Sequence, residues 1–196
     1  YPPLSSETPA GAASAATPTP LPDLLARAEQ RLAVGRIAEA EADLAEALKL
    51  EPGSAEVLAR QSVIALTRND AATAKELADR AATAAPTSAA ARLAQSYARQ
   101  SAGDLPGAID SLEAASAANP NDALLRARLA ELWLASGDYG RSEANAKAAI
   151  AANPDLGLAR TVQGFIDLAK VDIAAAKSSF QAAIEREPNA PLPRLG

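Results

Sequence analysis

Cysteine, histidine and methionine are absent from the 196-residue sequence, and aromatic side chains make up only 3% of it. The absence of cysteine excludes disulfides and thiolate chemistry, and the absence of histidine removes the usual zinc ligand and the usual base at neutral pH. Ser–His and Cys–His nucleophile systems are therefore excluded, together with most metal sites. We expect a protein that is not an enzyme and that has no catalytic residue, metal or cofactor.

One catalytic alternative survives these absences. Acidic pairs, such as Glu39 with Glu41 or Glu185 with Glu187, are the raw material of a two-carboxylate glycosidase. However, one tryptophan, three tyrosines and two phenylalanines leave few side chains to stack on a sugar. These acids also suit an ordinary solvated helix face, and this interpretation is favoured.

Charge and hydropathy exclude two further classes of partner. The net charge is −5, and the basic and acidic residues are interleaved along the chain. Because nucleic-acid binding needs a concentrated positive surface, we expect no nucleic-acid partner. No apolar run reaches the roughly 18 residues of a membrane span, so we expect no direct membrane insertion. Alanine supplies most of the apolar content, which favours closely packed helices.

The first 22 residues are rich in proline, alanine, serine and threonine, and Glu7 is their single charge. Proline at this density breaks helices and strands, and the other side chains are too small to build a core. We therefore predict a linker at residues 1–22 and a folded domain at residues 23–196. Because the chain begins without methionine, we expect it to be either part of a longer protein or a processed product.

Prolines within the predicted domain recur with a fixed period of 34 residues, at Pro52, Pro86, Pro120, Pro154 and Pro188. A period in this range indicates an array of structural repeats. Aligning the chain on these prolines defines five units, within which the proline occupies position 32. The units are residues 21–54, 55–88, 89–122, 123–156 and 157–190, followed by a partial unit at 191–196.

Small residues recur in register at three positions of the unit. Position 8 is Ala28, Ser62, Ser96, Ala130 and Gly164; position 20 is Ala40, Ala74, Ala108, Ser142 and Ala176; position 27 is Ala47, Ala81, Ala115, Ala149 and Ala183. Position 15 is glycine or asparagine in four units and Val171 in the fifth, and position 16 is aspartate in four units and Arg36 in the first. Glycine or asparagine followed by aspartate indicates a helix end and then a helix start. Each unit is therefore predicted to hold two helices, at positions 2–14 and 18–30, which touch at the small residues.

This pattern resembles the tetratricopeptide repeat family, whose signature has small residues at positions 8, 20 and 27, a Gly–Asp turn at 15–16 and proline at 32. The resemblance implies an all-α fold, a right-handed α-solenoid of five helix pairs plus the truncated start of a sixth. Two departures stand out. The bulky aromatic expected at position 4 is replaced by leucine or arginine, and position 11 is aromatic only at Trp133.

The same resemblance places the first helix of each unit on the concave side, with positions 2, 5, 9, 12 and 13 facing a groove. It implies a protein or peptide partner, either an amphipathic helix or an extended apolar segment, with Tyr97 and Phe165 as aromatic anchors. The candidate partner-binding residues are Arg60, Val63, Leu93, Tyr97, Gln100, Arg128, Glu131, Thr161 and Phe165. In the alternative interpretation, the aliphatic residues of this row only pack against neighbouring helices.

Arginine recurs at position 4 as Arg92, Arg126, Arg160 and Arg194. This column could grip an acidic partner, but we expect each arginine to lie along a neighbouring helix and pair with a nearby carboxylate. A second function class is a structural spacer or self-assembling array, with homo-oligomers forming through uncapped repeat ends.

Two short segments, residues 1–4 and 190–196, resemble parts of large bacterial proteins that join a FecR-like domain to tetratricopeptide repeats. This second resemblance implies a bacterial cell envelope or periplasmic location rather than the cytoplasm.

Overall fold

The computed structural model describes residues 19–188 and residue 193, and in this part of the chain the regular structure is helical, without strands. The helices are α1 (Leu21–Ala33), α2 (Ile37–Leu50), α3 (Ala55–Thr67), α4 (Ala71–Ala84), α5 (Ala89–Ser101), α6 (Leu105–Ala118), α7 (Ala123–Ala135), α8 (Tyr139–Ala152), α9 (Gly157–Ala169) and α10 (Ile173–Arg186). Two helices fall in each predicted unit, which confirms the all-α solenoid of helix pairs. Helix α1 begins at Leu21, so the last two residues of the predicted linker are helical. The predicted start of a sixth unit lies outside the described residues, apart from Pro193.

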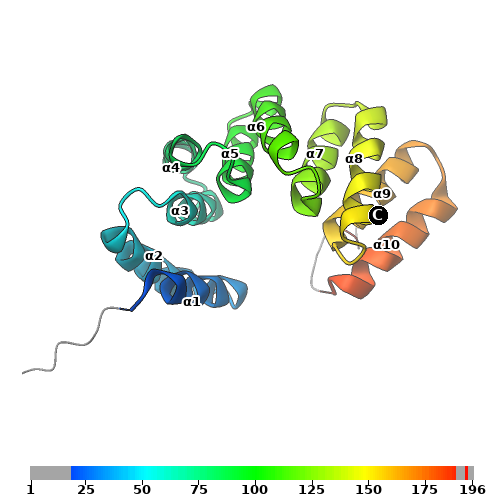
Figure 1. The fold of residues 1–196 in the computed structure, drawn as a ribbon. Helices are drawn as coiled ribbons and strands as arrows, with labels where there is room; N and C mark the ends of the chain where they lie inside the picture. Colours follow the sequence, from blue (N-terminus) through cyan, green and yellow to red (C-terminus); the bar gives the residue numbers. More distant parts are fainter. Residues whose placement is uncertain (1–18, 189–192, 194–196) are drawn as a thin grey trace, which may run out of the picture.

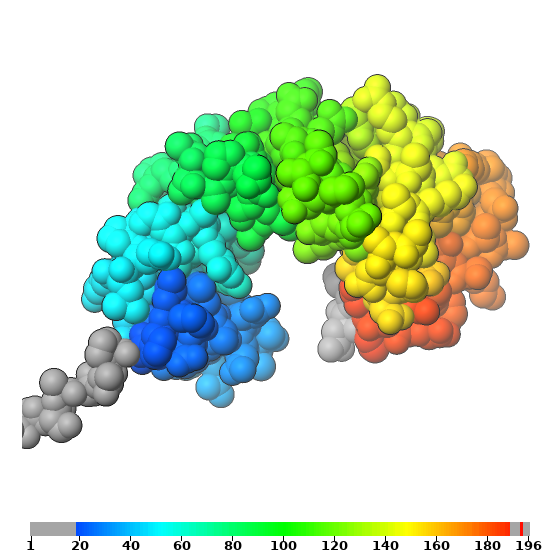
Figure 2. Space-filling view, viewed as in Figure 1, coloured from blue at the N-terminus to red at the C-terminus, as the bar shows by residue number. Residues whose placement is uncertain are grey.

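The five helix pairs stack side by side into an open arch (Figure 1). Each odd-numbered helix packs against the even-numbered helix that follows it, and each pair then contacts the next. Helices α3, α5 and α7 lie toward the inner side of the arch, while α4 and α6 lie toward its outer side. Figure 2 shows the same arch with a broad hollow on its inner side. We refer to this hollow, which α3, α5 and α7 border in the middle of the arch, as the inner groove.

The turn inside each unit ends the first helix in the same way five times. The residue at position 15 has a positive φ in every unit: Gly35, Asn69, Gly103, Gly137 and Val171. In the first unit, Gly35 donates its backbone N–H to the carbonyl of Leu32, and Arg36 donates to the carbonyl of Arg31. This pair of bonds defines a Schellman motif, which satisfies carbonyls that the helix end leaves free. The same two bonds recur in the other four units.

Aspartate at position 16 begins the second helix in four of the five units. The side chains of Asp70, Asp104, Asp138 and Asp172 each accept a hydrogen bond from a backbone N–H three residues later. These bonds satisfy donors that a helix start leaves unpaired. The first unit has Arg36 at this position, and α2 begins without a side-chain cap.

The small residues at positions 8, 20 and 27 lie where helices cross, and all of them are buried. Two serines also link the paired helices. Ser62 donates its hydroxyl to the carbonyl of Ala74 at 2.8 Å, and Ser142 donates to the carbonyl of Ala130 at 2.7 Å. The first bond runs from position 8 to position 20, and the second runs in the opposite direction. The two helices of a unit are thus close enough at positions 8 and 20 for a serine side chain to reach the backbone of the facing helix.

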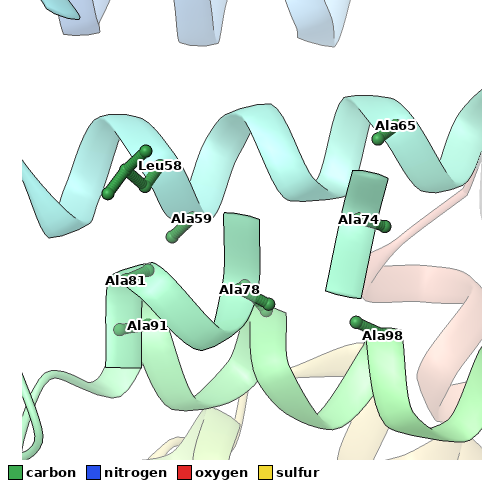
Figure 3. Packing of buried hydrophobic residues seen from close by; sticks show 9 residues of the cluster. Leu58, Ala59, Ala65, Ala74, Ala78, Ala81, Ala91 and Ala98 are labelled. Carbon is green, nitrogen blue, oxygen red and sulfur yellow. The ribbon is translucent and has the colours of Figure 1, made fainter. Parts of the chain in front are cut away.

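Side-chain size differs between neighbouring junctions of the array. Units 2 and 3 meet through a cluster built almost entirely of alanines, including Ala78, Ala81 and Ala94 (Figure 3). Units 3 and 4 meet through larger side chains, among them Leu112 and Leu125. Accordingly, α3 packs directly against α5, and α7 against α9, whereas the contact between α5 and α7 is small.

The position-4 arginines bind backbone carbonyls rather than the carboxylates we expected. Arg92 donates its Nε–H to the carbonyl of Pro86 at 2.8 Å, and Arg160 makes the same bond to Pro154 at 3.0 Å. Arg126 reaches Pro120 in the same way. Each bond ties the start of one unit to the proline that ends the previous unit, whereas Arg194 lies outside the described residues.

Val171 is the one β-branched residue held at positive φ among the described residues, with φ of 63°, in a conformation that glycine or asparagine adopts with less strain. We predict that Val171→Gly raises the free energy of unfolding by about 1 kcal/mol, because the strain is removed and the 78% exposed side chain loses little packing. Val34→Gly is the matched control, because Val34 is also exposed but has a φ of −102°. Urea unfolding followed by circular dichroism measures both, and a stabilised Val34→Gly would contradict the strain argument.

Gly164 lies directly beneath the ring of Phe180, and a Cβ atom at Gly164 would approach Phe180 Cε1 to 2.5 Å. Gly164→Ala is therefore expected to lower the free energy of unfolding by about 1–3 kcal/mol through overpacking. Adding Phe180→Leu should recover part of this loss, since Leu112 coexists with the larger Ser96 in the third unit. Gly140→Ala on α8 is the control, because the new Cβ meets only ordinary contacts. Equal losses at both glycines would show that helix geometry, not Phe180, sets the cost.

Candidate partner-binding surface

The nine candidate residues all lie on first helices, α3, α5, α7 and α9, as predicted from the repeat register. Their accessibility differs widely. Val63 is 41% exposed, whereas Thr161 and Arg128 are only 4% and 1% exposed. The other candidates are partly exposed: Arg60, Leu93, Tyr97, Gln100, Glu131 and Phe165.

Four candidates from two helices meet around the buried Arg128 guanidinium. Arg128 Nη1 donates to Glu131 Oε2 at 2.6 Å, and Arg128 Nη2 donates to Gln100 Oε1 of α5. The Arg128 Cζ atom lies 4.0 Å from the centre of the Tyr97 ring, which places the cation over the aromatic face. We call Tyr97, Gln100, Arg128 and Glu131 the Arg128 cluster. It connects α5 to α7 at the junction where these two helices otherwise make little contact.

Burial raises the pKa of the Tyr97 phenol above its ordinary value, and Arg128 partly opposes this rise. The phenol is therefore neutral at physiological pH. Within the cluster, the charge of Arg128 is matched by one carboxylate, that of Glu131. The Arg128 Nε–H, however, has no hydrogen-bond partner among the described residues. A buried guanidinium with one unsatisfied donor is held mainly by its carboxylate, its amide partner and the ring beneath it.

A second arginine occupies the equivalent position at the junction of units 1 and 2. Arg60 Nη1 lies 2.8 Å from Glu56 of its own helix, and Arg60 Nη2 lies 3.7 Å from Glu29 of α1. Arg60 and Arg128 both stand at position 6 of their units. At the other junctions this position holds Ala94 and Val162, which lie in the packed core. Position 6 thus carries arginine where first helices are apart and a small apolar residue where they touch.

Three other candidates have structural contacts of their own. The Phe165 ring meets Phe180 edge-on, with centroids 5.0 Å apart, so it packs against α10. Thr161 donates its hydroxyl to the carbonyl of Gly157, and Leu93 packs against the core between units 3 and 4. These three side chains are therefore held by contacts within the array, whereas Val63 is 41% exposed and Tyr97 is partly exposed.

Trp133 is half-buried: it packs against the core between units 3 and 4 and also borders an outer cleft. The Arg141 guanidinium stacks on its ring at 4.0 Å, and the two residues border a cavity of about 320 Å³ between α6 and α8. The hydroxyl of Ser116, buried at the edge of this cavity, has no hydrogen-bond partner among the described residues. Repeat register alone did not predict this cleft, because position 11 is aromatic in only one unit.

Neither a metal site nor a membrane span is found in the part of the chain that the structure describes. No group of His, Cys, Asp or Glu there could hold a metal ion. None of the described helices has the length and apolar character needed to cross a membrane. The acidic pair Glu39 and Glu41 is engaged by arginines, since Glu39 pairs with Arg31 and Arg36, and Glu41 pairs with Arg68.

The contacts of the Arg128 cluster lead to a prediction about the free energy of unfolding. Glu131→Gln leaves the buried guanidinium without a counter-charge and is expected to lower the free energy of unfolding by about 2–4 kcal/mol. Glu29→Gln is the matched control, because Glu29 is 73% exposed and should change stability by less than about 0.5 kcal/mol. Urea midpoints measure both. The double variant Arg128→Met with Glu131→Gln should be more stable than Glu131→Gln alone. If its urea midpoint is no higher, the explanation by a missing counter-charge is wrong.

Comparison with known proteins agrees with the architecture. Among solved structures, a thermophilic tetratricopeptide repeat protein of Thermus thermophilus is similar with a TM-score of 0.77 and 22% identity, over 90% of this chain and 96% of that one. A tetratricopeptide repeat protein of Parabacteroides merdae has a TM-score of 0.74 and 19% identity, over 90% and 69%. YrrB, described as a tetratricopeptide repeat protein with an unusual peptide-binding site, has a TM-score of 0.57 and 17% identity, over 88% and 89%.

At these identities the structural likeness concerns the fold alone, and comparison with curated proteins gives no match. Two family models, both described as tetratricopeptide repeat, match residues 25–89 and residues 99–163. The two matched stretches take in most of the helical array and agree with the repeat register seen in the structure. Domains of this type typically bind protein partners and are generally not enzymes. This chain therefore belongs to the tetratricopeptide repeat family.

Proposed function

We propose that this chain is a non-enzymatic scaffold that holds a peptide or helix of a partner protein in the inner groove. The proposal is carried by the row of position-9 residues on five successive first helices, which the family register assigns to the groove and which the structure leaves accessible. This row is Glu29, Val63, Tyr97, Glu131 and Phe165, and each of these side chains is at least partly exposed. Val63 and Tyr97 supply apolar contact near the middle of the row.

Three further observations support the proposal. The hollow in Figure 2 extends along several units, so a partner segment would contact many side chains at once. The described acidic groups also favour binding over catalysis, because several of them are held in ion pairs or helix caps rather than converging on an enclosed cavity. YrrB, which shares the fold, is described as having a peptide-binding site of its own.

The proposal is tested by selecting peptides from a phage-displayed library against the chain and measuring their binding by fluorescence anisotropy. Val63→Lys places a charge in the groove at an exposed position and should weaken selected peptides by about tenfold or more, since a charge facing an apolar partner is poorly solvated. Ala114→Lys on α6 is the matched control, because Ala114 is exposed on another helix. If both variants weaken peptide binding equally, the peptides do not bind in the groove.

The structural-spacer alternative predicts a different result from the same material. A spacer or self-assembling array selects no peptide that responds to Val63→Lys, and it sediments as an oligomer whose mass rises with concentration. Analytical ultracentrifugation distinguishes the two functions. A monomer that binds groove peptides supports the scaffold.

A further inference from the structure

A bond that recurs along the array is not made at its first junction. At the later junctions an arginine at position 4 donates its Nε–H to the carbonyl of the proline that ends the preceding unit. The donor–acceptor distances are 2.8, 3.3 and 3.0 Å for Arg92 to Pro86, Arg126 to Pro120 and Arg160 to Pro154. Between units 1 and 2 the same two positions hold Leu58 and Pro52, and a leucine side chain has no donor. Three such carbonyls therefore bind the chain's own arginines, and the chain supplies no arginine for the fourth.

The backbone around Pro52 has the same form as the backbone around the other three prolines. In all four turns the residue at position 34 donates its backbone N–H to the carbonyl of the residue at position 31. Glu51, just before Pro52, has a φ of −138°, and its equivalent Ala85, just before Pro86, has a φ of −139°. Because proline fixes its own φ, we infer that the Pro52 carbonyl points toward position 4 as the other three do.

The space beside Pro52 is open. Pro52, Gly53 and Leu58 border a hollow of about 820 Å³, and its other lining residues belong to α4. A Cβ atom added at Gly53 would meet no heavy atom within 4 Å. Leu58 is only 2% exposed, because it packs into the core between units 2 and 3 and leaves the hollow unfilled. Pro52 itself is exposed, so a side chain from another molecule can reach its carbonyl.

The charged side chains of the hollow balance one another and do not select a ligand. Lys75 pairs with Asp79 at 2.8 Å, and Arg80 pairs with Glu76 at 3.6 Å. Selection rests instead on the Pro52 carbonyl, which accepts a hydrogen bond. A carboxylate or phosphate ligand cannot bind there, because its oxygens are acceptors too.

Arginine fits this acceptor better than lysine does. In all three internal examples the donor is the Nε–H, which lies at the side of the guanidinium and leaves both Nη groups pointing onward. Lysine has no donor at this place on its stem. The methylene groups of an arginine can also lie along the ring of Pro52, as arginine stems commonly lie on apolar surface.

We propose that this hollow, which we call the Pro52 site, binds an arginine side chain of a partner protein in the place that Arg92, Arg126 and Arg160 take at the later junctions. The site is formed by the turn between α2 and α3 together with α4, whereas the proposed groove is assigned to residues of the first helices. The two proposals therefore concern different surfaces, and either can fail while the other stands.

The site is tested by nuclear magnetic resonance of the isotope-labelled whole chain, titrated with N-acetyl-arginine methylamide. A ligand bonded to the Pro52 carbonyl shifts that carbonyl signal and the amide signal of Gly53, which shares the same peptide bond. We expect a dissociation constant of roughly 1–10 mM for a single side chain. The citrulline probe keeps the Nε–H without the charge, and the lysine probe keeps the charge without the Nε–H. Each should bind at least about threefold more weakly than arginine.

Two variants move the binding in opposite directions. Leu58→Arg supplies the arginine within the chain, so it should shift the Gly53 amide signal without any probe and abolish the response to added arginine. Arg160→Leu frees the Pro154 carbonyl, so the amide of Asp155 should begin to respond to the arginine probe. Ala114→Arg on α6 adds the same charge at an exposed position and should leave the response of Gly53 unchanged.

Three outcomes overturn the inference. The first is a Gly53 amide signal that does not respond to arginine at about 100 mM. The second is equal binding of the arginine, citrulline and lysine probes, which removes the selection for a guanidinium. The third is an Asp155 amide that stays unresponsive in Arg160→Leu, because the internal bond is then no guide to an external ligand. This last variant decides the matter even where circular dichroism shows that Leu58→Arg does not fold.

Discussion

The helices of each unit cross where positions 8 and 20 face each other, and only a hydrogen, a methyl group or a hydroxymethyl group fits there. In two units this approach is close enough for a serine hydroxyl to bind the backbone carbonyl of the facing helix. Small side chains supply little apolar area each, so the array gains stability from many such contacts repeated in register. The arch, and with it the inner groove, is the geometric result of stacking these close pairs.

Much of the fold could be predicted from the sequence because local backbone chemistry repeats with it. Three positions determine helix ends through contacts within about one turn of the chain. These are position 32 with proline, position 16 with aspartate, and position 15 with a residue that tolerates positive φ. The exception at position 15 is instructive. Val171 adopts a positive φ of 63° although its side chain disfavours it. The hydrogen bonds of the Schellman motif and the packing of the last pair thus outweigh the preference of one residue.

The surface was harder to predict, because exposure depends on contacts between units. Arg128 and Val63 both belong to the groove by register, yet one is 1% and the other 41% exposed. Arg128 is buried because its side chain lies between α5 and α7, where it binds Gln100, a residue 28 positions earlier in the chain. The alternation of arginine and small apolar residues at position 6 is visible in the sequence. It can be interpreted as alternating helix separation only when the positions of the neighbouring helices are known.

That alternation gives the array a period longer than its sequence repeat. Arginine junctions and alanine-rich junctions take turns, so the structural unit spans two repeats, or 68 residues of the 34-residue register. Removing the third unit alone would set the buried guanidinium of Arg128 against α3, where Val63 and Leu66 stand at the register positions of Tyr97 and Gln100. Removing the third and fourth units together would take Arg128 away with its partners and bring Val162 to the place that Ala94 holds. The middle of the array is therefore built to change length by two repeats and not by one.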